Sequence, residues 1–289
     1  LLNQGGMEGD KNLVFAPYYD TSNWEPMYEK MSMFKNCTSL QYVPHYDTHL
    51  WETTSYMFDG CISLREVPLF NISSVKNMSY MFSKCTSLTT VPQFNTSSVT
   101  DMSGMFYGCT SLTTVPAFNT SSVTDMSIMF SGCTSLTTVP VFNTSSVTDM
   151  SSMFKECTSL TTVPQFNTSS VTDMSNMFYN CTSLQSLPEF DCTNVTNITA
   201  FFGYGNLREV TELGGFKNLK LAPTSYFIDK CPNLTHQSLL NVLNGLYDFT
   251  GNGETPTSSQ GKIGIGSTHL AKLTDEEKAI ATAKGWTLS

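Results

Sequence analysis

Hydrophobic and polar positions along this chain repeat with a period of 24 residues. Over residues 85–178 the unit reads CTSLTTVPxFNTSSVTDMSxMFxx almost without change, with x at the positions that differ. One cysteine and one proline recur in each unit, and the cysteines are Cys37, Cys61, Cys85, Cys109, Cys133, Cys157 and Cys181. A fixed period of this length indicates a solenoid, in which each unit forms one coil that stacks on the next.

Each unit holds one helix-like and one strand-like segment. The apolar residues of segment 99–109 fall on one face of a helix of about two to three turns, and Ser98 with Asp101 forms an S-x-x-D start signal. Residues 112–115 make a short β-prone run, which Pro116 ends because it lacks an N–H group. The unit therefore predicts one short helix and one short strand per coil.

A single unit is too small to fold alone, because burying its few apolar side chains does not offset the entropy lost on ordering it. Stacking pairs the strands of neighbouring coils in parallel, about 4.8 Å apart. Helices need more room, since a helix is about 10 Å across. We therefore expect an α/β solenoid that curves, with the strands on its inner side.

The C-terminal part of the chain departs from the repeat. Thr235 precedes an amphipathic helix, residues 262–266 are a candidate strand, and Thr274 opens a second helix with a capping box. We expect two regions. Residues 1–205 form the solenoid, with a three-residue insertion in its first coil, and residues 206–289 form an α+β cap that covers the apolar face of the last coil.

The unit NTSSVTDMSxMFxxCTSLTTVPxF resembles the BspA-type leucine-rich repeats of bacterial surface proteins, over roughly residues 13–205. The ending LTDEEKAIATAKGWTLS resembles tails on bacterial surface proteins and phage structural proteins. The resemblance implies a leucine-rich-repeat solenoid on a cell or virion surface that takes part in adhesion. It implies no catalytic residues.

Composition narrows the range of partners. The formal net charge is −9 and only 13% of the residues are charged, so a nucleic-acid backbone or an anionic membrane surface is a poor match. Apolar runs are only a few residues long, and no segment is expected to insert into a membrane. The chain begins with Leu1, and we expect that processing or truncation removed its true start. We expect an extracellular location, on a bacterial cell or a virion.

The repeated cysteines form a column on the apolar face of the unit. Stacked neighbours point the same way, which is unsuitable for disulfides, and none of the zinc-binding spacings fits. We expect a structural ladder of buried, reduced thiols that pack as small hydrophobic groups. Cys192 and Cys231 fall outside this ladder and are open to exposure or pairing.

Other polar clusters give no catalytic, metal or cofactor site. The aspartate column that starts at Asp101 could hold Ca²⁺, but stabilisation of each helix start is the favoured interpretation. His45, Asp47 and His49 could ligate a metal, but two exposed surface histidines are favoured. The sequence has no G-x-S-x-G, P-loop or H-E-x-x-H motif. We predict that the protein is not an enzyme and uses no cofactor.

The remaining candidates are surface residues. A regular surface of hydroxyl and methyl groups on the strand side is predicted to contact a ligand, and its residues are Thr90, Thr114, Thr138, Thr162, Gln93 and Gln165. A group of aromatic residues in the first coils is either a second contact surface or an N-terminal cap, and its residues are Trp24, Tyr42, Tyr46 and Trp51.

The favoured function is an extracellular binding or adhesion module, which engages a protein or glycan on a host or neighbouring cell. The alternative is a structural spacer, such as a component of a virion fibre or of a surface layer. An ice-binding threonine array is disfavoured, because it needs a flat face that a curved stack does not offer.

Overall fold

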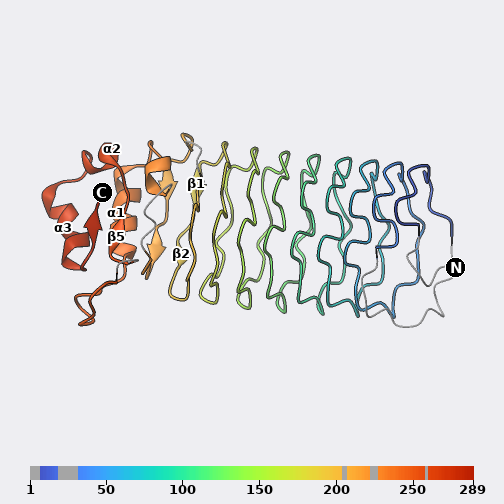
Figure 1. Cartoon of the computed structure of the whole chain (residues 1–289), viewed down its shortest axis with the longest axis horizontal. Helices are drawn as coiled ribbons and strands as arrows, with labels where there is room; N and C mark the ends of the chain where they lie inside the picture. Colours follow the sequence, from blue (N-terminus) through green and yellow to red (C-terminus); the bar gives the residue numbers. More distant parts are fainter. Residues whose placement is uncertain (1–6, 19–31, 204–206, 222–226, 258–259) are drawn as a thin grey trace.

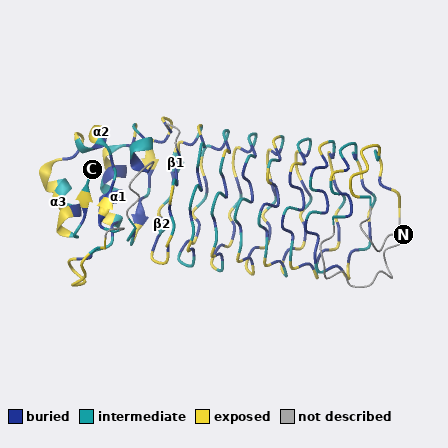
Figure 2. Ribbon diagram, viewed as in Figure 1, coloured by how far each residue is buried: buried dark blue, intermediate teal, exposed yellow. Residues whose placement is uncertain are grey.

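The computed structural model describes residues 7–18, 32–203, 207–221, 227–257 and 260–289 of the chain. Its repeats form coils that lie side by side along the long axis of the molecule (Figure 1). The apolar side chains of all these coils join in one continuous hydrophobic core, and Figure 2 shows that buried positions recur in the same places from coil to coil. The protein is a solenoid, as the repeat predicts.

Backbone hydrogen bonds join each coil to the next along two separate edges. On one edge, the aspartates of the DMS segments form parallel bridges, such as that between Asp101 and Asp125. On the other edge, the N–H group of Thr113 donates to the carbonyl of Thr89 at 3.2 Å. The predicted parallel pairing is confirmed, although in the described residues before Ser186 it consists of isolated bridges rather than continuous strands.

The helix predicted for segment 99–109 is wrong. Gly104 and Gly108 have φ angles of 58° and 69°, and an α-helix cannot continue through residues in this left-handed region. The same two positions are left-handed in other coils even where the residue is not glycine, as at Tyr80 (55°) and Lys84 (57°). The left-handed conformation is therefore a property of the coil and not of glycine alone.

The hydrogen bonds of this segment explain why it is not helical. The N–H group of Met105 bonds back to the carbonyl of Met102 at 3.2 Å, whereas the N–H group of Phe106 donates to the carbonyl of Met129 in the next coil at 2.9 Å. Alternate amides thus close tight turns and pair with the neighbouring coil. The apolar side chains still point into the core, because a run of tight turns can place them on one side just as a helix would.

The physical reason given for the predicted curvature does not hold, whereas the curvature itself stays a prediction. It depended on helices that would hold one side of the stack wider than the other. Instead, both edges carry backbone hydrogen bonds between successive coils, such as Thr124 N–H to the Thr100 carbonyl (2.8 Å) and Thr161 N–H to the Thr137 carbonyl (3.2 Å). The spacing is set by backbone pairing on both sides, and Figure 1 shows an extended array without a horseshoe bend.

Short parallel strands form where the regular repeat ends. β1 pairs with β3 and β2 pairs with β4, so that Phe190 lies opposite Phe216. The four strands are β1 (Ser186–Leu187), β2 (Phe190–Asp191), β3 (Glu212–Leu213) and β4 (Phe216–Lys217). Stacking by parallel pairing therefore continues beyond the last unit that carries the regular motif.

Among the described residues, the helices lie in the C-terminal part. The side chain of Thr235 accepts the Ser238 N–H group at the start of α1, and Thr274 with Glu277 forms the predicted capping box at the start of α3. The predicted strand is β5, which pairs in parallel with β6. The elements are η1 (Ile228–Lys230), α1 (His236–Gly245), β5 (Lys262–Ile263), α2 (Ser267–Leu270), α3 (Asp275–Ala283) and β6 (Thr287–Leu288).

The division into a solenoid of residues 1–205 and a cap of residues 206–289 stays a prediction. The boundary itself lies outside the described residues, as does the three-residue insertion predicted in the first coil. The pairing of β1 with β3 spans the boundary in sequence, so the regions on either side of it share one stack.

Candidate binding surfaces

The cysteine ladder lies in the core and offers no reactive group. All seven ladder cysteines are free and buried, and so are Cys192 and Cys231. The Cys109 thiol donates to the carbonyl of Phe82 at 2.9 Å, and the same bond recurs along the ladder. Burial raises the pKa of Cys109 to about 12, so the thiol stays protonated at neutral pH. A buried, protonated thiol is a poor nucleophile and a poor metal ligand.

The aspartate column shapes the backbone. One carboxylate oxygen of Asp101 accepts both the N–H group and the hydroxyl of Ser103, at 2.8 and 2.7 Å. The predicted helix start is thus a turn, but the aspartate still satisfies backbone N–H groups. Among the described residues, no three His, Cys, Asp or Glu side chains are grouped so that they could hold a metal ion. His49 pairs with Asp47 at 2.6 Å on the surface.

The residues predicted to contact a ligand on the strand side lie together on one surface, which we call the threonine face. All six are exposed, namely Thr90, Thr114, Thr138, Thr162, Gln93 and Gln165. The side-chain amides of Gln93 and Gln165 donate to backbone carbonyls of the following coil, at 3.0 and 2.7 Å. These two glutamines therefore help to join coils, and the hydroxyls are the groups left to face a ligand.

Two of the four candidate aromatic residues of the first coils are buried. Trp51 and Tyr46 are 1% and 0% exposed, because their rings fill the core beneath the first coils. Neither ring is therefore accessible to a ligand. Tyr42 is exposed and stacks on Phe15 with ring centroids 5.6 Å apart. Trp24 lies outside the described residues.

A second surface, which the sequence analysis does not single out, carries most of the residue differences between coils. Across the coils of residues 85–180 only four positions of the unit differ, one after the proline and three in the tight-turn segment. Coil by coil, the turn residues are Gly104, Tyr107 and Gly108; Ile128, Ser131 and Gly132; Ser152, Lys155 and Glu156; and Asn176, Tyr179 and Asn180. Apart from Gly104 and Ser131, they are exposed or half-buried. We call this surface the turn face.

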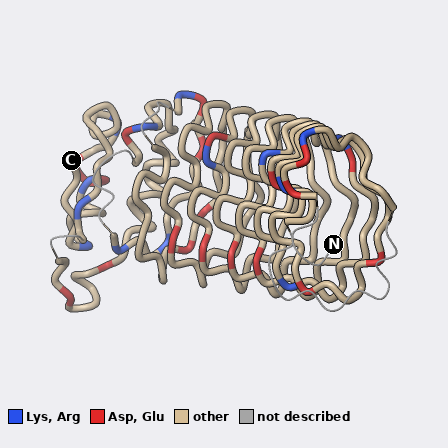
Figure 3. The backbone as a smooth tube through the Cα atoms, turned by 45° about the vertical axis from the view of Figure 1, so that its right-hand side comes forward, with Lys and Arg blue, Asp and Glu red and all other residues tan. Residues whose placement is uncertain are grey.

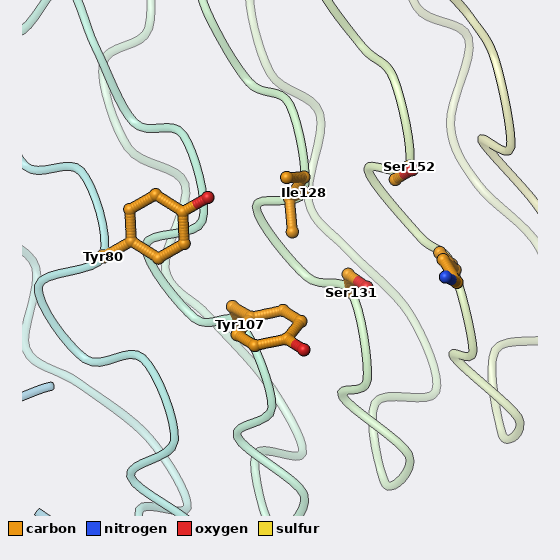
Figure 4. A pocket seen from close by; sticks show the side chains of 6 residues that line it. Tyr80, Tyr107, Ile128, Ser131 and Ser152 are labelled. Carbon is orange, nitrogen blue, oxygen red and sulfur yellow. The ribbon is translucent and has the colours of Figure 1, made fainter. Parts of the chain in front are cut away.

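The signal that identifies the turn face is already present in the repeat. The predicted helix rests on the apolar residues of this segment and gives no role to the variable positions of DMSxMFxx. Because the surrounding residues are identical from coil to coil, the x positions alone mark where one coil can differ chemically from the next. Figure 4 shows side chains from these positions projecting from neighbouring coils.

Charge is sparse on the array and mostly acidic. Figure 3 shows a row of acidic residues on successive coils and few basic residues between them. Among the described residues, no helix has the length and apolar character needed to cross a membrane.

Comparison with known proteins gives a family and a set of similar folds. The family model described as "Mycoplasma protein of unknown function, DUF285" matches residues 25–138 and 113–209. No curated protein matches the chain. A leucine-rich-repeat protein of Treponema pallidum is 17% identical, with a TM-score of 0.36, over 78% of this chain and 79% of its own.

Two further solved structures are similar at the same level. A leucine-rich cell surface protein of Faecalibacterium prausnitzii is 18% identical, with a TM-score of 0.39, over 90% of this chain and 81% of its own. A leucine-rich-repeat protein of Bacteroides ovatus is 17% identical, with a TM-score of 0.36, over 89% of this chain and 62% of its own length. All three are described as leucine-rich proteins.

Proposed function

Because this chain belongs to the family described as Mycoplasma protein of unknown function, DUF285, whose model spans its repeats, we propose a function for the repeats as a unit. The array is a non-enzymatic binding module, displayed on the outside of a bacterial cell, that engages a protein or a glycan of a host or neighbouring cell. Adhesion follows if the partner is fixed to a surface. The extracellular location is part of this proposal and rests on the likeness of the repeat motif to surface proteins.

One observation carries the proposal. The four coils of residues 85–180 are identical at every position that builds the core and the ladders, and they differ only at four positions of the unit, which lie mainly at the surface. A spacer needs no such differences, whereas a recognition surface needs chemically distinct side chains in fixed places. The ladders hold the backbone under these side chains rigid, which lowers the entropy that a partner must offset on binding.

The alternative is a structural spacer, in a surface layer or a virion fibre. Its support is the near-identity of four successive units, which repeats one surface rather than building a unique one. The two functions differ in one observable, because a binding module has a saturable partner and a spacer has none.

The test is a screen with the whole chain. The protein is immobilised and exposed to an array of neutral, sialylated and sulfated oligosaccharides and to a library of cell-surface protein ectodomains. We expect saturable binding to at least one of them, which thermal unfolding of the chain abolishes. A comparison variant changes Thr90, Thr114, Thr138 and Thr162 to Lys, which places charge on the threonine face and leaves the turn face unchanged. Loss of binding in this variant would assign the contact to the threonine face, and retained binding would assign it elsewhere. Absence of saturable binding to every probe would favour the spacer.

A further inference from the structure

The turn face contains an open cavity that crosses several coils. Its volume is about 340 Å³, and it is lined by Tyr80, Tyr107, Ile128, Ser131, Ser152 and Lys155 (Figure 4). These residues come from four successive coils and occupy only variable positions of the repeat. Small-molecule sites have volumes of roughly 300–1,000 Å³, so this cavity matches a small ring or a short stretch of a linear chain.

The cavity arises from the sizes of successive side chains in one column. Tyr56 and Tyr80 stack with ring centroids 5.0 Å apart and planes within 4°. The next residue in the column is Gly104, and a Cβ atom there would lie 2.5 Å from Cε1 of Tyr80. The Tyr80 ring therefore leans over the bare backbone of Gly104, and no side chain continues the stack until Ile128. The interruption leaves a hollow beside an aromatic ring.

A second column places another ring at the same hollow. Tyr107 is 37% exposed and is followed in its column by the small residue Ser131 and then by Lys155. Figure 4 shows the Tyr80 and Tyr107 rings on neighbouring coils, with Ser131 and Ser152 farther along the array. The cavity thus offers two aromatic rings at one end and hydroxyl groups at the other.

The charge of the cavity is low. Lys155 is its one charged lining residue. The ammonium group of Lys155 lies 4.0 Å from the carboxylate of Glu156 and 5.2 Å from the centre of the Tyr179 ring, so an acidic group and an aromatic ring already lie beside its charge. Burial, with Tyr56 and Asp125 nearby, raises the pKa of Tyr80, whose phenol therefore stays neutral and able to donate a hydrogen bond.

We propose that this cavity binds a neutral oligosaccharide, with sugar rings stacked on Tyr80 and Tyr107 and sugar hydroxyls bonded to Ser131, Ser152 and Lys155. The proposal rests on the function proposed above and names its site and ligand class. The C–H faces of a pyranose pack against electron-rich ring faces, and its hydroxyls both donate and accept, which suits serine, tyrosine and lysine together. A cavity that spans four coils, at about 4.8 Å per coil, favours a linear chain of a few sugars over a single one.

Two alternatives fit the cavity less well. An anionic ligand would meet one partly balanced ammonium group and neighbouring carboxylates, including Asp101 and Asp125, which act on Tyr80. A folded protein partner would need a surface of roughly 800 Å² on each side, far larger than this hollow alone provides.

The experiment uses the whole chain and an array of neutral oligosaccharides, with sialylated and sulfated ones as comparators, followed by calorimetric titration of the strongest binder. Gly104→Tyr displaces the Tyr80 ring, which occupies the place of the new Cβ atom, and fills the hollow. The backbone tolerates a tyrosine there because Tyr80 has nearly the same φ angle. Tyr107→Ala removes one ring. Tyr18→Ala is the control, since Tyr18 is an exposed ring (73%) that does not line the cavity.

We expect neutral oligosaccharides to bind the wild type. Tyr107→Ala weakens binding by about tenfold or more, Gly104→Tyr abolishes it, and Tyr18→Ala leaves it unchanged. Unfolding midpoints in urea show that each variant is folded. If binding survives Gly104→Tyr and Tyr107→Ala but is lost with Thr114→Lys, the site is wrong while the binding function stands. If only charged glycans or protein ectodomains bind, the ligand class is wrong, and if nothing binds, both proposals fail.

Discussion

The buried thiols predict a loss of stability in alkaline solution. The pKa values of Cys109 and Cys157 rise from an ordinary value of 9.0 to about 12 in the folded protein, with burial as the main cause. Above pH 9 the unfolded chain therefore releases protons that the folded chain keeps, and the equilibrium shifts towards unfolding. The stability that these thiols supply is complete below pH 9 and is lost progressively as the pH rises from 9 towards 12.

The magnitude follows from the two pKa values. At pH 10 an unfolded thiol with a pKa of 9.0 is about nine-tenths ionised, while a folded thiol with a pKa of about 12 remains protonated. Each of these thiols then contributes about 1.4 kcal/mol less to the free energy of unfolding at pH 10 than at pH 8. For Cys109 and Cys157 together the loss is roughly 3 kcal/mol. The other ladder thiols act in the same direction, because burial raises their pKa values as well, as at Cys85, Cys133 and Cys181.

The assay is urea unfolding at pH 8 and pH 10, under a non-thiol reductant, for the wild type and for a variant with Cys109→Ala and Cys157→Ala. The variant is less stable at both pH values because it has lost packing. The free energy of unfolding of the variant should nevertheless decrease between pH 8 and pH 10 by roughly 3 kcal/mol less than that of the wild type. Equal decreases in the two proteins would refute the burial of protonated thiols in the ladder.

Three further predictions concern the stack. Deleting one whole unit, residues 109–132, should leave a shorter folded protein with a cooperative thermal transition. Deleting residues 109–120 should abolish that transition, because only a whole unit restores the register of both ladders. Trp51→Ala should lower the free energy of unfolding by roughly 3–5 kcal/mol, since the ring is buried in the core. A decrease of less than about 0.5 kcal/mol in urea unfolding would instead indicate an exposed ring. Lys284→Met should lower the free energy of unfolding by about 1–3 kcal/mol. The Lys284 ammonium group donates to the carbonyls of Asn244 at 2.6 Å and Leu246 at 3.1 Å, at the end of α1. An unchanged melting temperature would show that these bonds add nothing to stability.

The stacking and the core could be predicted from the sequence, but the shape of the coil could not. The apolar pattern predicts that Val99, Met102 and Phe106 face inward, and all three are buried in the structure. The same spacing fits both a helix and a run of tight turns, because both bring every third or fourth residue to one side. What decides between them is the pairing of alternate amides with the next coil, as at Phe106, and a sequence pattern carries no information on that pairing.

The candidate site was predictable only in part. The exposed threonines stand between a buried leucine and a buried valine in each coil, as Thr113 and Thr114 do between Leu112 and Val115, so their placement could be anticipated from their polarity. Trp51 could not be placed, because an aromatic residue in a divergent first coil is equally suited to a contact surface and to a core. The hollow beside Tyr80 depends on how a ring leans over Gly104 in the next coil, which is a relation between coils rather than within one.

The central claim is that variable residues of the turn face give recognition to an otherwise invariant scaffold. Its most direct test is a calorimetric titration of a triple variant, Tyr107→Ser, Ile128→Asn and Lys155→Ser, with the strongest binder from the oligosaccharide and ectodomain screen. Each new residue already occupies the same position in another coil, at Ser131 and Asn176. We predict that binding falls below detection while the urea midpoint stays within the range of the wild type. Wild-type affinity in this variant would contradict the claim.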